Sequence, residues 1–200
     1  MRTELLECER AARADGLAAG LGRALAGTDV AGAAPGPYAA VPAGLVAEGD
    51  EVRGHRLADL EGIVFVARPE GRLFDREACA DAGRRLAAAR LGLARRLLDA
   101  AVDHLSGRTG GGEPLIRKQL VMGTIADAVT EIELLRQYVL TLHDGAALAD
   151  AHARLDAVGW EIARLFGASG YIADNETRAL YVSALVANTW IDGEQRNDRV

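Results

Sequence analysis

The glycine-rich segment that begins at Arg108 is the first place where the residue types could do chemistry. It reads Arg-Thr-Gly-Gly-Gly-Glu and lies between two long stretches with helical periodicity. A P-loop needs a strand before it and a Gly-Lys-Ser/Thr sequence after it, and this segment has neither. The glycines therefore indicate the end of a helix. Arg108 adds a fixed cation near backbone donors, an arrangement that suits a phosphate group.

The histidines and cysteines form no metal-ligating or nucleophilic pattern. The histidines are His55, His104, His143 and His152, and no two of them form an HxH or HxxxH pair. We therefore predict no metal site and expect these side chains on solvated faces. The segment 167–170 is not a GxSxG nucleophile elbow, because a helical pattern precedes it where that motif needs a strand. The residues by themselves predict no self-sufficient catalytic group.

Helices between residues 75 and 190 must position these groups. Asp75 suits the N-cap of a helix over 75–106, and Pro114 suits the first turn of a second helix over 114–143. The apolar residues of the second helix recur at steps of four and three, at Val121, Ile125, Ala128, Ile132, Leu135, Val139 and Leu142. Such a seam must be buried against other helices.

Two more helices follow with the same kind of pattern. The third carries its apolar residues from Leu148 to Leu165, and the fourth covers 175–190. One side of the fourth helix is expected to carry Leu180, Ala184, Leu185, Asn188 and Ile191. Short connections between long amphipathic helices favour an up-down four-helix bundle, so the fold class is mainly α.

The region before the bundle has a different character. A helix is expected over 3–26, followed by a proline- and glycine-rich stretch over 27–50. Short strands are expected near 38–41 and 63–66, with the turn between two strands at 69–71. The predicted organisation is therefore a small N-terminal region, 1–74, with one helix and an incomplete β element, and a helical bundle domain, 75–200.

Composition limits the classes of partner. The formal net charge is −6, which argues against non-specific nucleic-acid binding. No apolar run approaches the roughly 18 residues that a membrane span needs, and the charged N-terminus lacks the apolar segment of a signal peptide. We expect a soluble, cytoplasmic protein.

Four segments follow one another in the order and spacing of a known family. They read LGLARRLLDAAVDHLSGR, RTGGGEPLIRKQL, IADAVTEIELLR and LFGASGYIADNETRALY. Together they resemble the C-terminal helical domain of the acyl-CoA dehydrogenase family over about residues 75–191. The resemblance implies a bundle that assembles into homodimers or homotetramers and an FAD held partly across a subunit boundary. It also implies that Arg108 contacts the flavin pyrophosphate and that the turn Gly167, Ala168, Ser169 and Gly170 approaches the cofactor of a neighbouring subunit.

The chain departs from the family where the catalytic base is expected. In most members a glutamate after the fourth bundle helix removes the α-proton of the acyl thioester, and Ile191 falls at that position here. Asp192 is adjacent and is the first candidate base. Some members carry the base on the first bundle helix, where Asp81 is the nearest carboxylate. Gly110 and Gly111 replace the Gln-Phe pair that follows the family's arginine, and the family's N-terminal helical domain is missing or reduced to one helix.

The resemblance therefore implies an FAD-dependent acyl-CoA dehydrogenase-like protein in specialised metabolism. Its substrate would be an acyl group on CoA or on an acyl carrier protein. Two alternatives remain open at the level of sequence. One is a non-redox enzyme that has lost the flavin, and the other is a non-catalytic subunit that pairs with a full-length homologue.

Overall fold

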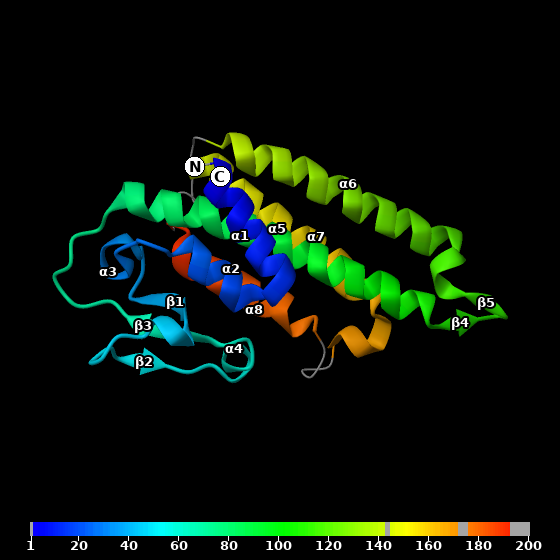
Figure 1. Ribbon diagram of the computed structural model, residues 1–200, viewed down its shortest axis with the longest axis horizontal. Helices are drawn as coiled ribbons and strands as arrows, with labels where there is room; N and C mark the ends of the chain where they lie inside the picture. The colour runs from blue at the N-terminus through cyan, green and yellow to red at the C-terminus, as the bar shows by residue number, and fades with distance from the viewer. Residues whose placement is uncertain (1, 143–144, 172–175, 193–200) are drawn as a thin grey trace, which may run out of the picture.

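Four long helices form an up-down bundle in the computed structural model, which describes residues 2–142, 145–171 and 176–192 (Figure 1). They are α5 (Arg76–Ser106), α6 (Gln119–Thr141), α7 (Gly145–Leu165) and α8 (Arg178–Trp190). Successive helices run in opposite directions along the long axis of the molecule. The predicted fold class is confirmed.

Helix α5 is the centre of the molecule, with other helices around it. Asp75 caps its N-terminus, because the Asp75 carboxylate accepts a hydrogen bond of 3.0 Å from the backbone N–H of Ala78. The nine residues from Leu86 to Ala94 are all buried, so no side of this stretch faces solvent. At Gly92 an added Cβ would lie 2.0 Å from the carbonyl oxygen of Glu9, so only glycine lets the helix α1 (Arg2–Asp15) cross α5 this closely.

The connection between α5 and α6 is a small hairpin, which corrects two expectations. Gly107, the C-cap of α5, is right-handed, with φ −81°. Strands β4 (Thr109–Gly110) and β5 (Glu113–Pro114) pair around Gly111 and Gly112, whose φ angles of 68° and 83° suit a type I′ turn. Pro114 therefore lies in a strand, and a 3₁₀ turn (η2, Leu115–Arg117) separates it from α6.

The apolar seams are confirmed for α6 and α7 and are wrong for α8. In α6 the buried side chains are Ala128, Ile132, Leu135 and Val139, and in α7 the predicted residues from Leu148 to Leu165 are buried. The buried face of α8 consists instead of Ala179, Val182, Ser183, Val186, Ala187 and Trp190. Both faces of α8 carry aliphatic residues, and the buried face is the one that also carries the large Trp190 side chain.

The N-terminal region begins with two helices where one was expected. Helix α1 ends at Asp15 and α2 (Leu17–Ala24) follows, because Gly16 adopts φ 90°, which a helix cannot contain. Both helices pack on α5. A short helix, α3 (Val30–Ala33), leads to the sheet.

The β element is a three-stranded antiparallel sheet beside the bundle (Figure 1). Its strands are β1 (Tyr38–Pro42), β2 (Val52–Arg53) and β3 (Ile63–Ala67), in the order β1-β3-β2, with a 3₁₀ turn (η1, Ala43–Leu45) and helix α4 (Arg56–Asp59) between them. The expectation of a strand after the 69–71 turn is wrong, because the described residues 68–75 lead directly into α5.

The sheet is joined to the C-terminal end of α8. The indole N–H of Trp190 donates to the Ala40 carbonyl at 2.9 Å, and the Thr189 hydroxyl accepts from the Ala40 N–H at 3.1 Å. One hydrophobic cluster includes residues from both regions of the chain. None of the described helices is long and apolar enough to cross a membrane.

Candidate functional site

A buried arginine links α5, α7 and α8. Arg90 is 4 % exposed. Its Nε donates to the Ser183 hydroxyl at 2.8 Å, and one terminal nitrogen lies 2.9 Å from His152 Nδ1 and 3.3 Å from the His152 carbonyl. The other terminal nitrogen forms an ion pair with Asp156. All three guanidinium nitrogens thus have a partner, which offsets the cost of burying the charge.

His152 completes this buried cluster. Its Nε2 lies 3.0 Å from the Gly83 carbonyl, and the residue is 1 % exposed. The expectation that His152 lies on a solvated face is therefore wrong. Burial lowers the pKa of Arg90, and the Asp156 carboxylate opposes this shift by stabilising the cation. The cluster therefore joins α5, α7 and α8 through buried hydrogen bonds between their side chains.

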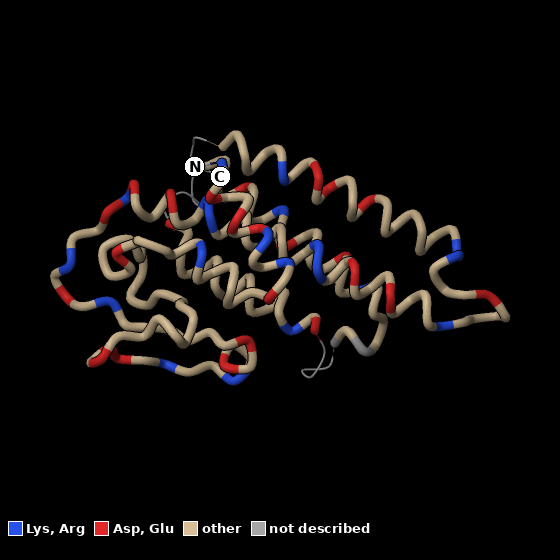
Figure 2. The backbone as a smooth tube through the Cα atoms, in the orientation of Figure 1, with Lys and Arg blue, Asp and Glu red and all other residues tan. Residues whose placement is uncertain are grey.

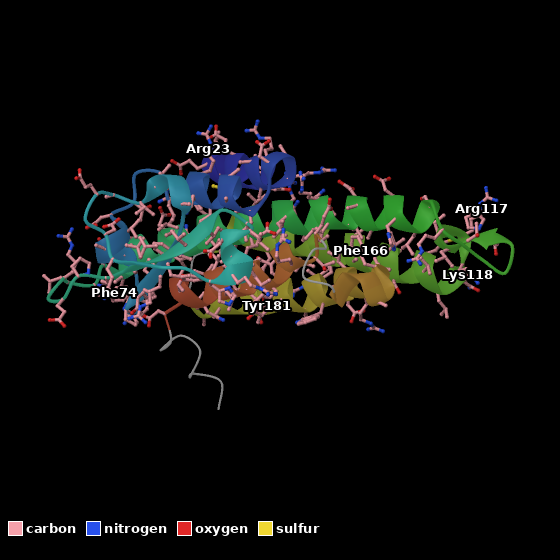
Figure 3. The ribbon with its side chains drawn as sticks, turned by 90° about the horizontal axis from the view of Figure 1, so that it is seen from below. Arg23, Phe74, Arg117, Lys118, Phe166 and Tyr181 are labelled. Carbon is pink, nitrogen blue, oxygen red and sulfur yellow. The ribbon has the colours of Figure 1, made fainter. Side chains whose placement is uncertain are left out.

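A cavity of about 280 Å³ adjoins the Arg90 cluster. Arg90, Asp156 and Ser183 border one side of it, and most of the remaining wall is apolar. Trp160 on α7 and Tyr181 on α8 also border the cavity and are exposed to solvent. Tyr181 is labelled in Figure 3.

The two candidate bases lie in separate ion pairs. Asp192 follows α8, is 8 % exposed, and accepts a hydrogen bond of 2.5 Å from the Arg76 guanidinium. Arg76 also lies over the Phe74 ring, with its Cζ 5.7 Å from the ring centre. Asp81 pairs with Arg85 one turn further along α5. Asp192 is thus held in a defined position at the N-terminal end of α5.

Arg108, the first of the predicted cofactor contacts, lies at the other end of α5. A terminal nitrogen of Arg108 lies 3.2 Å from His104 Nε2, and the His104 ring is 5.4 Å from the ring of Phe166. Phe166 directly precedes the 3₁₀ turn η3 (Gly167–Tyr171), so His104 and Phe166 lie between Arg108 and the start of this turn. At Gly170 an added Cβ would lie 2.5 Å from the Ala163 carbonyl, so packing on α7 already requires that glycine.

Arg117 and Lys118 add two exposed cations near the hairpin, as Figure 3 shows. The Lys118 Nζ lies 3.7 Å from the position of a Cβ added at Gly110. Among the residues that the structure describes, neither these two nor Arg108 forms an ion pair with a carboxylate. Basic positions are visible at this end of the bundle in Figure 2. The hairpin end can therefore accept an anionic group such as a pyrophosphate.

Helix α5 separates the two halves of the candidate site within one chain. It contains 31 residues, which corresponds to a length of about 45 Å. Asp192 lies beside its first residue, and Arg108 follows its last. One dinucleotide cannot reach both residues of the same chain. In the part of the chain that the structure describes, no group of His, Cys, Asp and Glu residues could hold a metal ion.

Comparison with known proteins gives one family and a set of similar folds. Residues 79–195 match the family model described as "Acyl-CoA dehydrogenase, C-terminal domain". Among curated proteins, none matches the chain significantly in sequence. Solved structures with the same fold include a variant of the Tcur3481-Tcur3483 steroid ACAD, with 20 % identity over 75 % of this chain and 46 % of that one, and a TM-score of 0.58.

Two further solved structures are similar to the same extent. An acyl-CoA dehydrogenase from Geobacillus kaustophilus has 16 % identity over 76 % of this chain and 48 % of that one, with a TM-score of 0.56. A glutaryl-coenzyme A dehydrogenase in complex with glutaryl-CoA has 20 % identity over 70 % of this chain and 43 % of that one, with a TM-score of 0.54. The chain therefore spans about half the length of these relatives.

Proposed function

Because the chain belongs to the acyl-CoA dehydrogenase family through that family's C-terminal domain, we propose that it is a subunit of a flavin-dependent acyl-thioester dehydrogenase. The main support is the hairpin end of the bundle. Arg117 and Lys118 are exposed at the hairpin, and Arg108 lies 3.2 Å from His104, whose ring is 5.4 Å from that of Phe166. Exposed cations of this kind suit the pyrophosphate of FAD.

The proposed active unit contains at least two chains. Arg108 and Asp192 lie at opposite ends of a helix about 45 Å long, so one FAD would use Arg108 of one chain and Asp192 of another. A homodimer or homotetramer would supply both. Pairing with a full-length homologue is the second candidate, since a homologue would supply the second site in the same way.

Asp192 is the proposed general base. A base must be held within hydrogen-bond reach of the proton that it removes. The Arg76 guanidinium orients the Asp192 carboxylate, and the Phe74 ring in turn supports Arg76. Asp192 would accept the α-proton of an acyl thioester, while bound FAD would supply the acceptor for the β-hydride. Asp81 is the alternative base and would have to act from its pair with Arg85.

The proposed substrate is an acyl group on CoA or on an acyl carrier protein, oxidised in the cytoplasm as a step of specialised metabolism. One of the solved relatives carries glutaryl-CoA, which supports a CoA thioester as the first substrate to test. Activity assays with acyl-CoA thioesters of different acyl groups would identify the preferred acyl group.

Cofactor binding is tested by the absorption spectrum of the purified protein and by titration with FAD. We expect a bound flavin spectrum and at least a roughly tenfold weaker affinity in Arg108→Ala, because one charge-assisted contact to phosphate is lost. Arg164→Ala is the matched control, since Arg164 is an exposed arginine whose carboxylate partner among the described residues is Glu161, one turn earlier on α7. A colourless protein that does not take up FAD, alone or with a full-length homologue, would refute the proposal.

The base is tested separately with Asp192→Asn. This variant should retain FAD and lose acyl-thioester oxidation by at least about a hundredfold, which is typical for removing a general base. If oxidation is unchanged in Asp192→Asn and abolished in Asp81→Asn, the base is Asp81.

A further inference from the structure

We propose that the cavity between α5, α7 and α8 is a binding site for a small, neutral, mainly apolar molecule that carries a hydroxyl or an amide N–H group. This site is separate from the one proposed for dehydrogenation. It lies beside the middle of α5, whereas Arg76 and Asp192 lie at the first turn of that helix.

The size and walls of the cavity favour an apolar ligand that contains at least one aromatic ring, because a cavity of about 150 Å³ already holds benzene. Its volume of about 280 Å³ is at the lower end of the range for ligand pockets. Leu155 and Leu180 contribute apolar wall, and the small Ala184 side chain lies one turn from Leu180 on α8. Trp160 is 60 % exposed and Tyr181 is 46 % exposed, so two aromatic side chains that border the cavity also remain open to an entering ring.

The charges at the cavity exclude an anionic ligand. Arg90 is paired with Asp156, and Arg178 on α8 is paired with Glu61 through a contact of 2.8 Å. Each positive charge therefore already has a carboxylate partner. A carboxylate group entering the apolar cavity would lose its water without gaining a counter-ion, which is costly.

Asp156 gives the cavity a preference for hydrogen-bond donors. Its Oδ1 accepts from Arg90, yet the Asp156 side chain is 36 % exposed whereas that of Arg90 is 3 % exposed. The carboxylate thus extends from the buried cluster to the edge of the cavity. An ionised carboxylate accepts hydrogen bonds and donates none. A ligand hydroxyl or amide N–H would therefore bind Asp156 and leave the ion pair with Arg90 intact.

The test compares phenol, anisole and benzoate by ligand-observed NMR on the full chain. Phenol should bind saturably with a Kd of about 10 mM or lower, as small aromatic ligands do in preformed pockets. Anisole, which cannot donate, should bind about tenfold more weakly, the ratio that a hydrogen bond to a charged acceptor gives. Benzoate should bind more weakly than anisole. Absence of saturable phenol binding, or equal binding of benzoate, would overturn the proposal.

Variants locate the binding and identify the acceptor. Ala184→Phe fills the cavity and should weaken phenol binding at least about tenfold, and Ala184→Leu provides a milder version if the larger side chain prevents folding. Ala126→Phe, on the exposed face of α6, is the control and should bind as the wild type does. Asp156→Asn should reduce the preference for phenol over anisole to about twofold or less, because the amide can donate to both. Phenol binding that survives Ala184→Phe or Ala184→Leu would place the ligand elsewhere.

Competition with FAD separates this site from the cofactor site. Gly170 of the η3 turn also borders the cavity, so the two sites are neighbours. Phenol should still bind after the protein is saturated with FAD. Displacement of phenol by FAD would assign the cavity to the cofactor and overturn the present proposal, while it would support the flavin proposal.

Discussion

Replacement of Gly92 by alanine should destabilise the protein, although the same change usually stabilises a helix. In a helix interior, Gly→Ala is favourable by about 1 kcal/mol. At Gly92, however, the new Cβ would lie 2.0 Å from the carbonyl oxygen of Glu9 and 3.1 Å from the backbone nitrogen of Arg13. Backbone atoms of α1 cannot rotate away, so α1 must move from α5 by more than about 1 Å, since C···O contacts are normally at least about 3.3 Å.

The cost of that movement exceeds the gain in helix propensity. Overpacking of this kind costs about 1–3 kcal/mol and sometimes more. The shift also strains the ion pairs of Glu9 with Arg136, at 2.9 Å, and with Arg95, at 3.2 Å. We expect a net loss of about 2 kcal/mol in the free energy of unfolding, which lowers Tm by roughly 4–8 °C in a chain of this size.

Gly123→Ala is the matched control for this prediction. Gly123 lies in α6, is exposed, and has nothing within 4 Å of the position of an added Cβ. This variant should gain up to about 1 kcal/mol. Urea unfolding followed by circular dichroism measures both variants. If Gly92→Ala is as stable as Gly123→Ala, the close crossing of α1 over α5 is not a constraint and the reasoning fails.

Three other changes test the interior. Arg90→Ala should lower the free energy of unfolding by about 1–3 kcal/mol in urea titrations, because it leaves the buried His152 and the partly exposed Asp156 without their partner. A loss well below about 1 kcal/mol would show that the cluster adds little. Burial raises the pKa of the Cys8 thiol and of the Cys79 thiol to about 11 from an ordinary value of 9.0, so the folded state favours the protonated thiols. This stabilisation is present below pH 9 and is lost as pH rises to about 11. The free energy of unfolding of a Cys8→Ala, Cys79→Ala double variant should therefore fall less steeply over this pH range than that of the wild type. Equal slopes for the two proteins would contradict the burial of these thiols. Trp190→Phe removes the hydrogen bond to the Ala40 carbonyl and should lower the free energy of unfolding by about 1–3 kcal/mol, as measured by thermal unfolding. Unchanged stability would show that this bond contributes nothing.

The sequence was sufficient to predict the bundle because periodicity and caps act locally. The seam of α6 and α7 follows from spacing alone, and Asp75 marks the start of α5 through its own side chain. The face of α8 could not be predicted in the same way. That helix has aliphatic residues on two sides, and the choice depends on which side meets its neighbours. Gly16 was a visible weak point, but its φ of 90° comes from the packing of α1 and α2 on α5.

The Arg90 cluster is the part of the site that sequence reasoning missed. Its partners are 62, 66 and 93 residues away along the chain, so no local motif contains them. One signal was present: Arg90 is the only charged residue in the nine-residue run LAAARLGLA, which is apolar on every side of a helix. A charge in such a run must be buried with a partner. By contrast, Arg108 and the η3 turn were assigned to the cofactor through a family resemblance, and their role stays a prediction.

The attachment of β1 to the end of α8 has a consequence for the order of assembly. Ala40 emerges from the ribosome well before Trp190, yet the two residues are hydrogen-bonded across a separation of 150 positions. The backbone N–H and carbonyl of Ala40 therefore lack their partners in α8 until nearly all of the bundle has been synthesised. Long-range pairings of this kind slow folding and leave strands open to other chains in the meantime. This contact makes completion of the fold a late event during synthesis, because it links the early strand to the fourth bundle helix.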